Sequence, residues 1–149
     1  VGAYHFFSTK VPVSQQVALF VKNCLYAHGD LPPALDVEPS TKLIMQMGGP
    51  KVMLAAVRKW LVSVEHVMKV RPILYISQTF INKYLNDNYA DGKYLRDNYQ
   101  VWIARYGEYK PDVHLAIWQL SPDGRVRGIR GEVDINVFNG YDDLFKEFK

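Results

Sequence analysis

Hydrophobic residues recur with two different periods along the chain, and these periods alternate. Residues 1–7 (VGAYHFF) form an apolar run rich in strand-forming residues, which predicts a buried strand. Apolar residues at helical spacing follow, from a cap at Ser14 to about His28, and Gly29 ends this predicted helix. Residues 34–38 predict a second strand. The first quarter of the chain is therefore expected to run strand, helix, strand.

Two loops and a long helix are predicted in the middle of the chain. Residues 39–49 and 87–98 lack a clear hydrophobic period and are expected to be loops. Pro50 suits the first turn of a helix that ends before Pro72. The expected core stripe of this helix consists of Met53, Val57, Trp60, Val64 and Val67.

Strands dominate the rest of the prediction. Residues 72–77 predict a strand that passes at Ser77 into a short helix, and residues 100–106 and 114–120 predict two more strands. The sequence SPDG predicts a turn. After it we expect a strand pair over 125–129 and 132–138 and a terminal helix over 141–149.

The order of these elements indicates the fold class. Strands that alternate with amphipathic helices predict an α/β fold with a parallel sheet, and continuous apolar strands predict cover on both of its faces. A doubly wound sheet and a partial barrel both fit. A full barrel of eight strand-helix units usually needs about 200 residues or more, whereas this chain has 149. We expect one domain over residues 1–149.

Composition narrows the possible functions. The net charge is +3 and the basic residues are scattered, so no basic stripe indicates a nucleic-acid partner. No apolar run is long enough to predict a membrane span. Cys24 is the only cysteine and the four histidines lack ligand spacing, so neither a disulfide within the chain nor a metal or other cofactor is expected.

Two carboxylates stand out in the sequence LPPALDVEPS, residues 31–40. Asp36 and Glu38 are two residues apart on a predicted strand, so they share one face at a separation of about 6 to 7 Å. They also lie at the carboxyl end of the strand, where parallel α/β folds carry their active sites. Repulsion between two close carboxylates raises one pKa, giving the acid and the ionised partner that glycosidic bond cleavage requires. Taken alone, the pair fits a solvated edge strand equally well.

Aromatic and polar residues lie near the ends of several predicted strands. Aromatic faces that surround acids are typical of sugar-binding sites, although each aromatic residue alone fits core packing as well. Asp134 and Asn136 share one face of the last predicted strand. The candidate substrate-binding residues are Tyr4, Phe6, Tyr75, Trp102, Tyr106, Trp118 and Gln119.

Six segments in this order resemble glycoside hydrolase family 25, the Chalaropsis-type lysozymes: VGAYHFF, LPPALDVEPS, PILYIS, WIARY, IWQLSPDGRVRGI and EVDINVFNG. The resemblance implies a modified TIM-like barrel of five β/α units followed by three strands. It implies that Glu38 is the general acid, that Asp36 orients or stabilises the reacting acetamido group, and that Asp134 is a further catalytic acid.

The chain also departs from the family pattern. The family begins with strands reading roughly GIDVS and IKATEG, and neither sequence occurs here. The chain opens without Met at a segment similar to the family's third strand, so we expect the first two strands and one site acid to lie outside it. A barrel that lacks two strands would expose the edges of its sheet.

The resemblance implies an N-acetylmuramidase that cuts the β-1,4 bond after N-acetylmuramic acid. Its partner would be the glycan strand of peptidoglycan, and it would be secreted or act at the cell wall. Two alternatives remain open. One is a chitinase or glucosaminidase, because chitinases also carry an Asp-x-Glu pair at a strand end, and the other is a protein that binds glycan without cleaving it.

Overall fold

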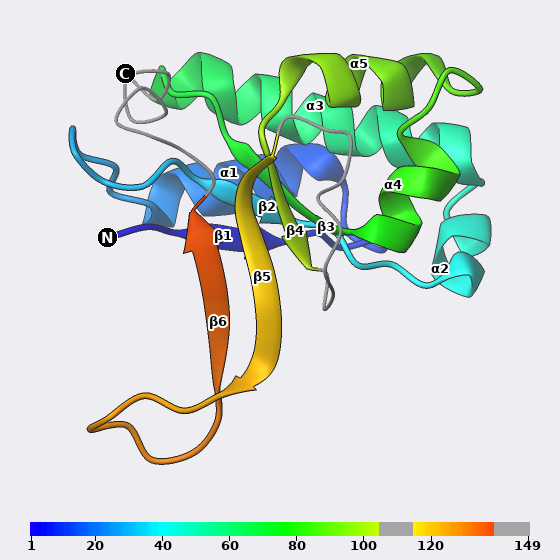
Figure 1. Ribbon diagram of the computed structural model, residues 1–149. Helices are drawn as coiled ribbons and strands as arrows, with labels where there is room; N and C mark the ends of the chain where they lie inside the picture. Colours follow the sequence, from blue (N-terminus) through cyan, green and yellow to red (C-terminus); the bar gives the residue numbers. More distant parts are fainter. Residues whose placement is uncertain (105–114, 139–149) are drawn as a thin grey trace.

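The sheet has six strands, which lie side by side in the order of the chain (Figure 1). The computed structural model describes residues 1–104 and 115–138. Neighbouring strands from the first to the fifth are parallel, and the sixth is antiparallel to the fifth. The strands are β1 (Tyr4–Phe6), β2 (Ala34–Asp36), β3 (Ile73–Ser77), β4 (Val101–Ala104), β5 (Leu115–Gly124) and β6 (Val133–Phe138).

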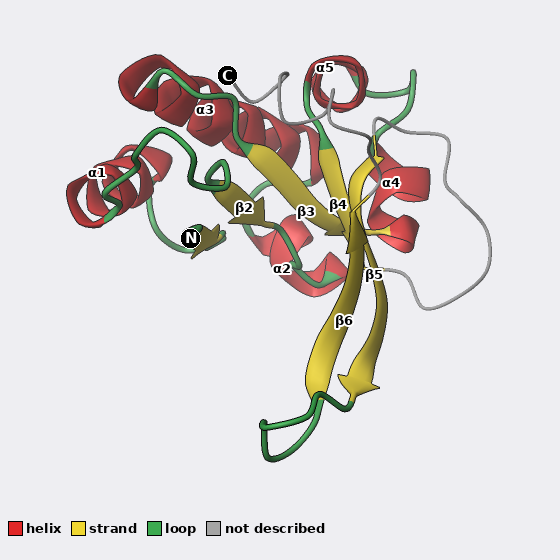
Figure 2. Ribbon diagram, turned by 60° about the vertical axis from the view of Figure 1, so that its left-hand side comes forward, coloured by secondary structure: helices red, strands yellow, loops and turns green. Residues whose placement is uncertain are grey.

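The helices lie on one face of this sheet. Helices α1, α3 and α5 are side by side there, and β5 and β6 form a hairpin that extends beyond the other strands (Figures 1 and 2). Among the described residues, β1 and β6 each pair with one neighbour, so the sheet is open. The helices are α1 (Val13–Asn23), α2 (Thr41–Gln46), α3 (Pro50–Met68), α4 (Gln78–Tyr84) and α5 (Ala90–Asn98).

Strand alternation separates the core from the opposite face of the sheet. Leu35, Leu74 and Ile103 are fully buried against the helices. The alternate positions on the same strands carry Asp36, Tyr75 and Trp102, which are only partly buried because no described helix covers their face. The expectation of cover on both faces is therefore wrong for the described residues, and the uncovered face is available for a site.

The predicted α/β class and parallel sheet are confirmed. Helix α3 begins at Pro50 as expected, and four of its five predicted core residues are fully buried. The fifth, Val67, is 52% exposed because it lies on the solvent side of the last turn. The short helix after β3 is also confirmed, since the Ser77 hydroxyl accepts a hydrogen bond from the backbone N–H of Phe80.

Three predictions about helices are wrong. Pro12, not Ser14, precedes the first turn of α1, and the helix ends at Asn23 because Cys24 has extended backbone angles. The predicted loop 39–49 contains α2, which Ser40 caps by accepting a hydrogen bond from the N–H of Leu43. The predicted loop 87–98 contains α5, which buries only Gly92 and Leu95 and so has little hydrophobic period.

The predictions for the hairpin also need correction. SPDG lies inside β5 rather than in a turn, and β6 pairs with β5 rather than with residues 125–129. Register irregularities between Gln119 and Gly124 let the strand accommodate Pro122, since proline in a sheet is confined to edges and bulges. The predicted helix 141–149 lies outside the described residues. No described helix is long and apolar enough to cross a membrane.

Candidate active site

A cavity of about 310 Å³ opens on the face of the sheet that the helices leave uncovered. Six strands or strand ends contribute to it. Strand alternation and register explain this convergence, because Asp36 lies opposite Tyr75 and Tyr75 lies opposite Trp102 across neighbouring strands. The lining residues are Tyr4, Ala34, Asp36, Glu38, Tyr75, Trp102, Gln119 and Asp134.

Asp36 and Glu38 lie together at the carboxyl end of β2, as their spacing predicts. Between them Val37 is buried in the core, and Glu38 itself is exposed. The pKa of Asp36 is raised to about 7, mainly by burial and in addition by the hydrogen bond and negative charge of Glu38. The pair therefore retains one proton near neutral pH. The role of general acid that the resemblance implies for Glu38 would place the proton there, whereas the structure raises the pKa of Asp36.

The carboxylate of Asp36 has an unused acceptor. Its Oδ1 atom is buried and accepts no hydrogen bond from any described residue. A buried oxygen without a partner is unfavourable by about 1 to 3 kcal/mol, so native structures rarely retain one without a reason. An N–H or O–H group of a ligand in the cavity would satisfy this atom.

Two hydrogen bonds fix the aromatic wall of the cavity. The hydroxyl of Tyr75 donates to Oε1 of Gln119 at 2.7 Å, and Nε1 of Trp102 donates to Oδ1 of Asn136 at 2.9 Å. The rings of Tyr75 and Trp102 meet edge to face, with centroids 5.3 Å apart. The wall is rigid because both rings are held at their polar ends and against each other.

The hairpin and the first strand complete the cavity from opposite sides. Asp134 comes from β6, where it shares a face with Asn136. Tyr4 comes from β1 and is 70% exposed. Three acids and four of the seven predicted binding residues therefore line one cavity, although they come from positions up to 130 residues apart.

Two predicted binding residues, Phe6 and Trp118, do not line this cavity. Phe6 shares the face of Tyr4 on β1 but remains 58% exposed outside it. Trp118 lies next to Gln119 on β5 and so points to the opposite face, where it packs against the hydrophobic core. Tyr106 lies outside the described residues.

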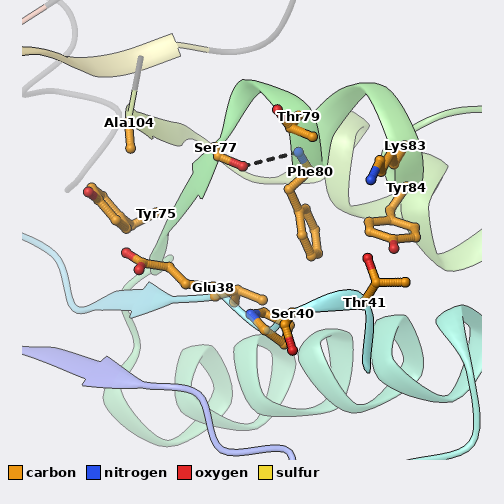
Figure 3. A pocket seen from close by; sticks show the side chains of 12 residues that line it. Glu38, Ser40, Thr41, Tyr75, Ser77, Thr79, Phe80, Lys83, Tyr84 and Ala104 are labelled. Carbon is orange, nitrogen blue, oxygen red and sulfur yellow. Dashed lines mark hydrogen bonds between the residues drawn. The ribbon is translucent and has the colours of Figure 1, made fainter. Parts of the chain in front are cut away.

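Sequence reasoning missed a second cavity, of about 430 Å³, which shares Glu38 and Tyr75 with the first (Figure 3). Its other residues come mainly from the segment after Glu38 and from α4. Ser40 follows β2 and caps α2, while Ser77 ends β3 and caps α4. A helix-capping serine at the carboxyl end of a predicted strand is the sequence signal that could have indicated this cavity. Among the described residues, no group of three or more His, Cys, Asp or Glu side chains could hold a metal ion.

Comparison with known proteins gives concordant matches. The sequence model of the glycosyl hydrolases family 25 matches residues 1–129. The chain is 37% identical over 142 residues to the uncharacterized protein YegX of Escherichia coli K12, and the match covers 93% of this chain and 48% of YegX. The chain therefore spans about half the length of the curated relatives it matches.

Solved structures agree with the sequence comparison. A family 25 glycosyl hydrolase from Bacillus anthracis superimposes with a TM-score of 0.77 and 26% identity, over 99% of this chain and 68% of that one. The spore cortex lytic enzyme SleM of Clostridium perfringens gives a TM-score of 0.74 and 25% identity, over 96% and 50% of the two chains. These matches confirm the predicted barrel-type α/β fold and the resemblance found in the sequence. The chain belongs to family 25 of the glycosyl hydrolases.

Proposed function

We propose that this chain carries the catalytic centre of a lysozyme-type muramidase, which hydrolyses the β-1,4 bond between N-acetylmuramic acid and N-acetylglucosamine in peptidoglycan. The observation that carries the proposal is the Asp36–Glu38 pair, which retains a proton near neutral pH inside an aromatic-walled cavity. Family membership and the similarity to a spore cortex lytic enzyme support the same activity. Such a substrate implies that the enzyme acts at the cell wall.

Glu38 is proposed as the general acid and base. It receives the proton that the pair shares and donates it to the departing glycosidic oxygen, so the bond to the anomeric carbon breaks without forming a free alkoxide. In the second step Glu38 takes a proton from a water molecule that attacks the same carbon. The exposed position of Glu38 suits this role because substrate and water can both reach it.

Asp36 is proposed to direct the acetamido group of the sugar. The unsatisfied Oδ1 of Asp36 accepts the acetamido N–H, and the carbonyl oxygen of that group then attacks the anomeric carbon from within the substrate. The negative charge that Asp36 acquires stabilises the positive ring that forms. Water opens the ring with overall retention of configuration. Asp134, across the cavity, adds negative charge beside the same carbon.

Binding without cleavage is the competing function, and a specific observation favours it. Among the described residues the sheet is open at β1, and Tyr4 and Phe6 are 70% and 58% exposed there. An open aromatic face can hold a sugar ring without the complete set of catalytic groups. The experiment must therefore separate cleavage from binding.

Digestion of purified peptidoglycan by the full-length protein tests the proposal. The products are reduced with borohydride and identified by mass spectrometry. A muramidase produces reduced muramic acid ends, and Glu38→Gln abolishes them while Glu132→Gln, on the exposed hairpin loop, does not. Reduced glucosamine ends would instead indicate a glucosaminidase. Glycan binding with no new reducing ends would establish the binding function and overturn the proposal.

A further inference from the structure

The second cavity adjoins the proposed catalytic acid and has a distinct composition. Figure 3 shows Glu38 at one end, directed toward Tyr75, and Lys83 with Tyr84 at the other end. The ring of Phe80 lies between the two ends. A group that enters this cavity therefore extends away from the bond that Glu38 would cleave.

The middle of the cavity suits small apolar groups. The rings of Phe80 and Tyr84 meet edge to face with centroids 5.0 Å apart, and both side chains are largely buried. The walls nearby add the hydroxyls of Thr41 and Thr79. The volume of about 430 Å³ lies within the range of about 300 to 1,000 Å³ that is typical of small-ligand sites. The cavity therefore combines an apolar surface for methyl groups with hydroxyls for polar atoms.

The far end of the cavity carries the positive charge of Lys83. Lys83 forms no ion pair with any described residue. The six ion pairs among the described residues all involve other side chains or the N-terminus. The ammonium group of Lys83 belongs to the lining of the cavity. An ammonium beside apolar rings and hydroxyls is complementary to a carboxylate on a small, partly apolar substituent.

We propose that this cavity binds the carboxylate-bearing substituent of N-acetylmuramic acid, with Lys83 pairing with the carboxylate and Phe80 contacting the neighbouring methyl group. This inference rests on the proposed function, because it takes peptidoglycan as the substrate. The carboxylate is either the free one of a lactyl ether that carries no stem peptide, or one within a stem peptide attached to the lactyl group as an amide. A neutral glycan such as chitin has no such group, so the cavity selects muramic acid over N-acetylglucosamine at this position.

Binding measurements in a Glu38→Gln background test the proposal without turnover. Calorimetry compares three soluble probes: the disaccharide N-acetylglucosaminyl-N-acetylmuramic acid with its stem peptide, the same disaccharide without the peptide, and chitobiose. Each is titrated into the full-length protein, alone and with Lys83→Met, Lys83→Arg or Lys93→Met. Lys93 is an exposed lysine on α5 outside the cavity and serves as the matched control.

Lys83→Met should raise the Kd of a carboxylate-bearing probe about three- to fivefold, which is what a partly exposed ion pair contributes. Lys83→Arg should restore most of the affinity, and Lys93→Met should leave it unchanged. The affinity for chitobiose should not respond to any change at Lys83. The probe that responds identifies the source, because the stem peptide is joined to the lactyl carboxyl as an amide. A response of the first probe alone indicates a carboxylate of the peptide, and a response of the second alone indicates the free lactyl carboxylate. A response of both shows that Lys83 pairs with either carboxylate.

Two results would overturn the proposal: an unchanged Kd for both carboxylate-bearing probes, or an equal loss of affinity for chitobiose. Absence of binding by all three probes would also overturn it. These results are independent of the digestion experiment. A protein that binds the acidic probes through Lys83 but cuts no peptidoglycan would retain this inference and lose the proposed activity.

Discussion

The hydroxyl of Tyr75 donates a hydrogen bond of 2.7 Å to Oε1 of Gln119, from β3 to β5 across the intervening strand β4. Gln119 is only 3% exposed, so its amide depends on partners inside the protein. The bond passes beside Trp102, whose ring contacts that of Tyr75. Three consecutive strands are thus joined on the face that carries the proposed active site.

Tyr75→Phe should lower the free energy of unfolding by about 1 kcal/mol, because the variant leaves the buried amide oxygen of Gln119 without its donor. The phenyl ring itself can remain against Trp102. Urea unfolding followed by fluorescence measures the change. Tyr26→Phe is the control, since the hydroxyl of Tyr26 makes no hydrogen bond among the described residues. Equal stability of the Tyr75→Phe variant and the wild type would contradict the prediction.

Asp36 should make part of the stability depend on pH. Its pKa rises from 3.8 to about 7 on folding, so between these values the folded state holds a proton that the unfolded state has lost. The contribution of Asp36 to the free energy of unfolding therefore falls as the pH rises from about 4 to about 7. Asp36→Asn cannot ionise, so the variant should gain stability relative to the wild type from pH 4 to pH 7 and no more above it.

Urea unfolding at several pH values from 4 to 8 gives this difference. Tyr26→Phe removes no carboxyl group, and its difference from the wild type should be the same at every pH. A constant difference between Asp36→Asn and the wild type would mean that Asp36 titrates alike in the folded and unfolded states.

Trp102→Phe should loosen the hairpin while leaving the ring contact with Tyr75 in place. The variant lacks the N–H that donates to Oδ1 of Asn136 at 2.9 Å. Without this hydrogen bond, the free energy of local opening at the hairpin should fall by about 1 kcal/mol. The rate of amide hydrogen exchange in β6 should therefore rise about fivefold. Asn136→Ala should have the same effect, and the double variant should add nothing to it. Additive effects would show that the two side chains act separately.

Gly92→Ala should be strongly destabilising, although alanine normally favours a helix. A Cβ atom at this position would lie 1.9 Å from the backbone oxygen of Tyr84, so α4 and α5 would have to move apart. Overpacking of this kind costs about 3 kcal/mol. Thermal unfolding measures the loss. Lys93→Ala, at the next and exposed position of α5, should change the stability by less than about 0.5 kcal/mol.

The pair at the centre of the site could be predicted from the sequence because it depends on strand alternation alone. Asp36 and Glu38 are two residues apart and must share a face, while Val37 between them must enter the core. The side-chain direction at Trp118 and Gln119 could not be predicted in the same way. Adjacent strand residues point to opposite faces, so only one could line the cavity, and the irregular register between β4 and β5 decides which.

The missed elements share a physical cause. Helix α5 buries Gly92 and Leu95, and its contact with α4 depends on the absence of a side chain at Gly92, which leaves no hydrophobic period to detect. The second cavity was missed for a related reason. Lys83 and Thr79 resemble ordinary solvent-facing helix residues until α4 is placed beside the end of β2.

Glu38 stands on the boundary between two cavities whose outer walls have different origins. The first is built by strands joined through the sheet, and the second is built mainly by the segment after β2 and by α4, a single short helix. The two walls can therefore evolve at different rates. Substitutions in residues 79–84 would diversify substrate preference while the strand-borne acids stay untouched, so a library confined to this helix is a direct route to altered selectivity.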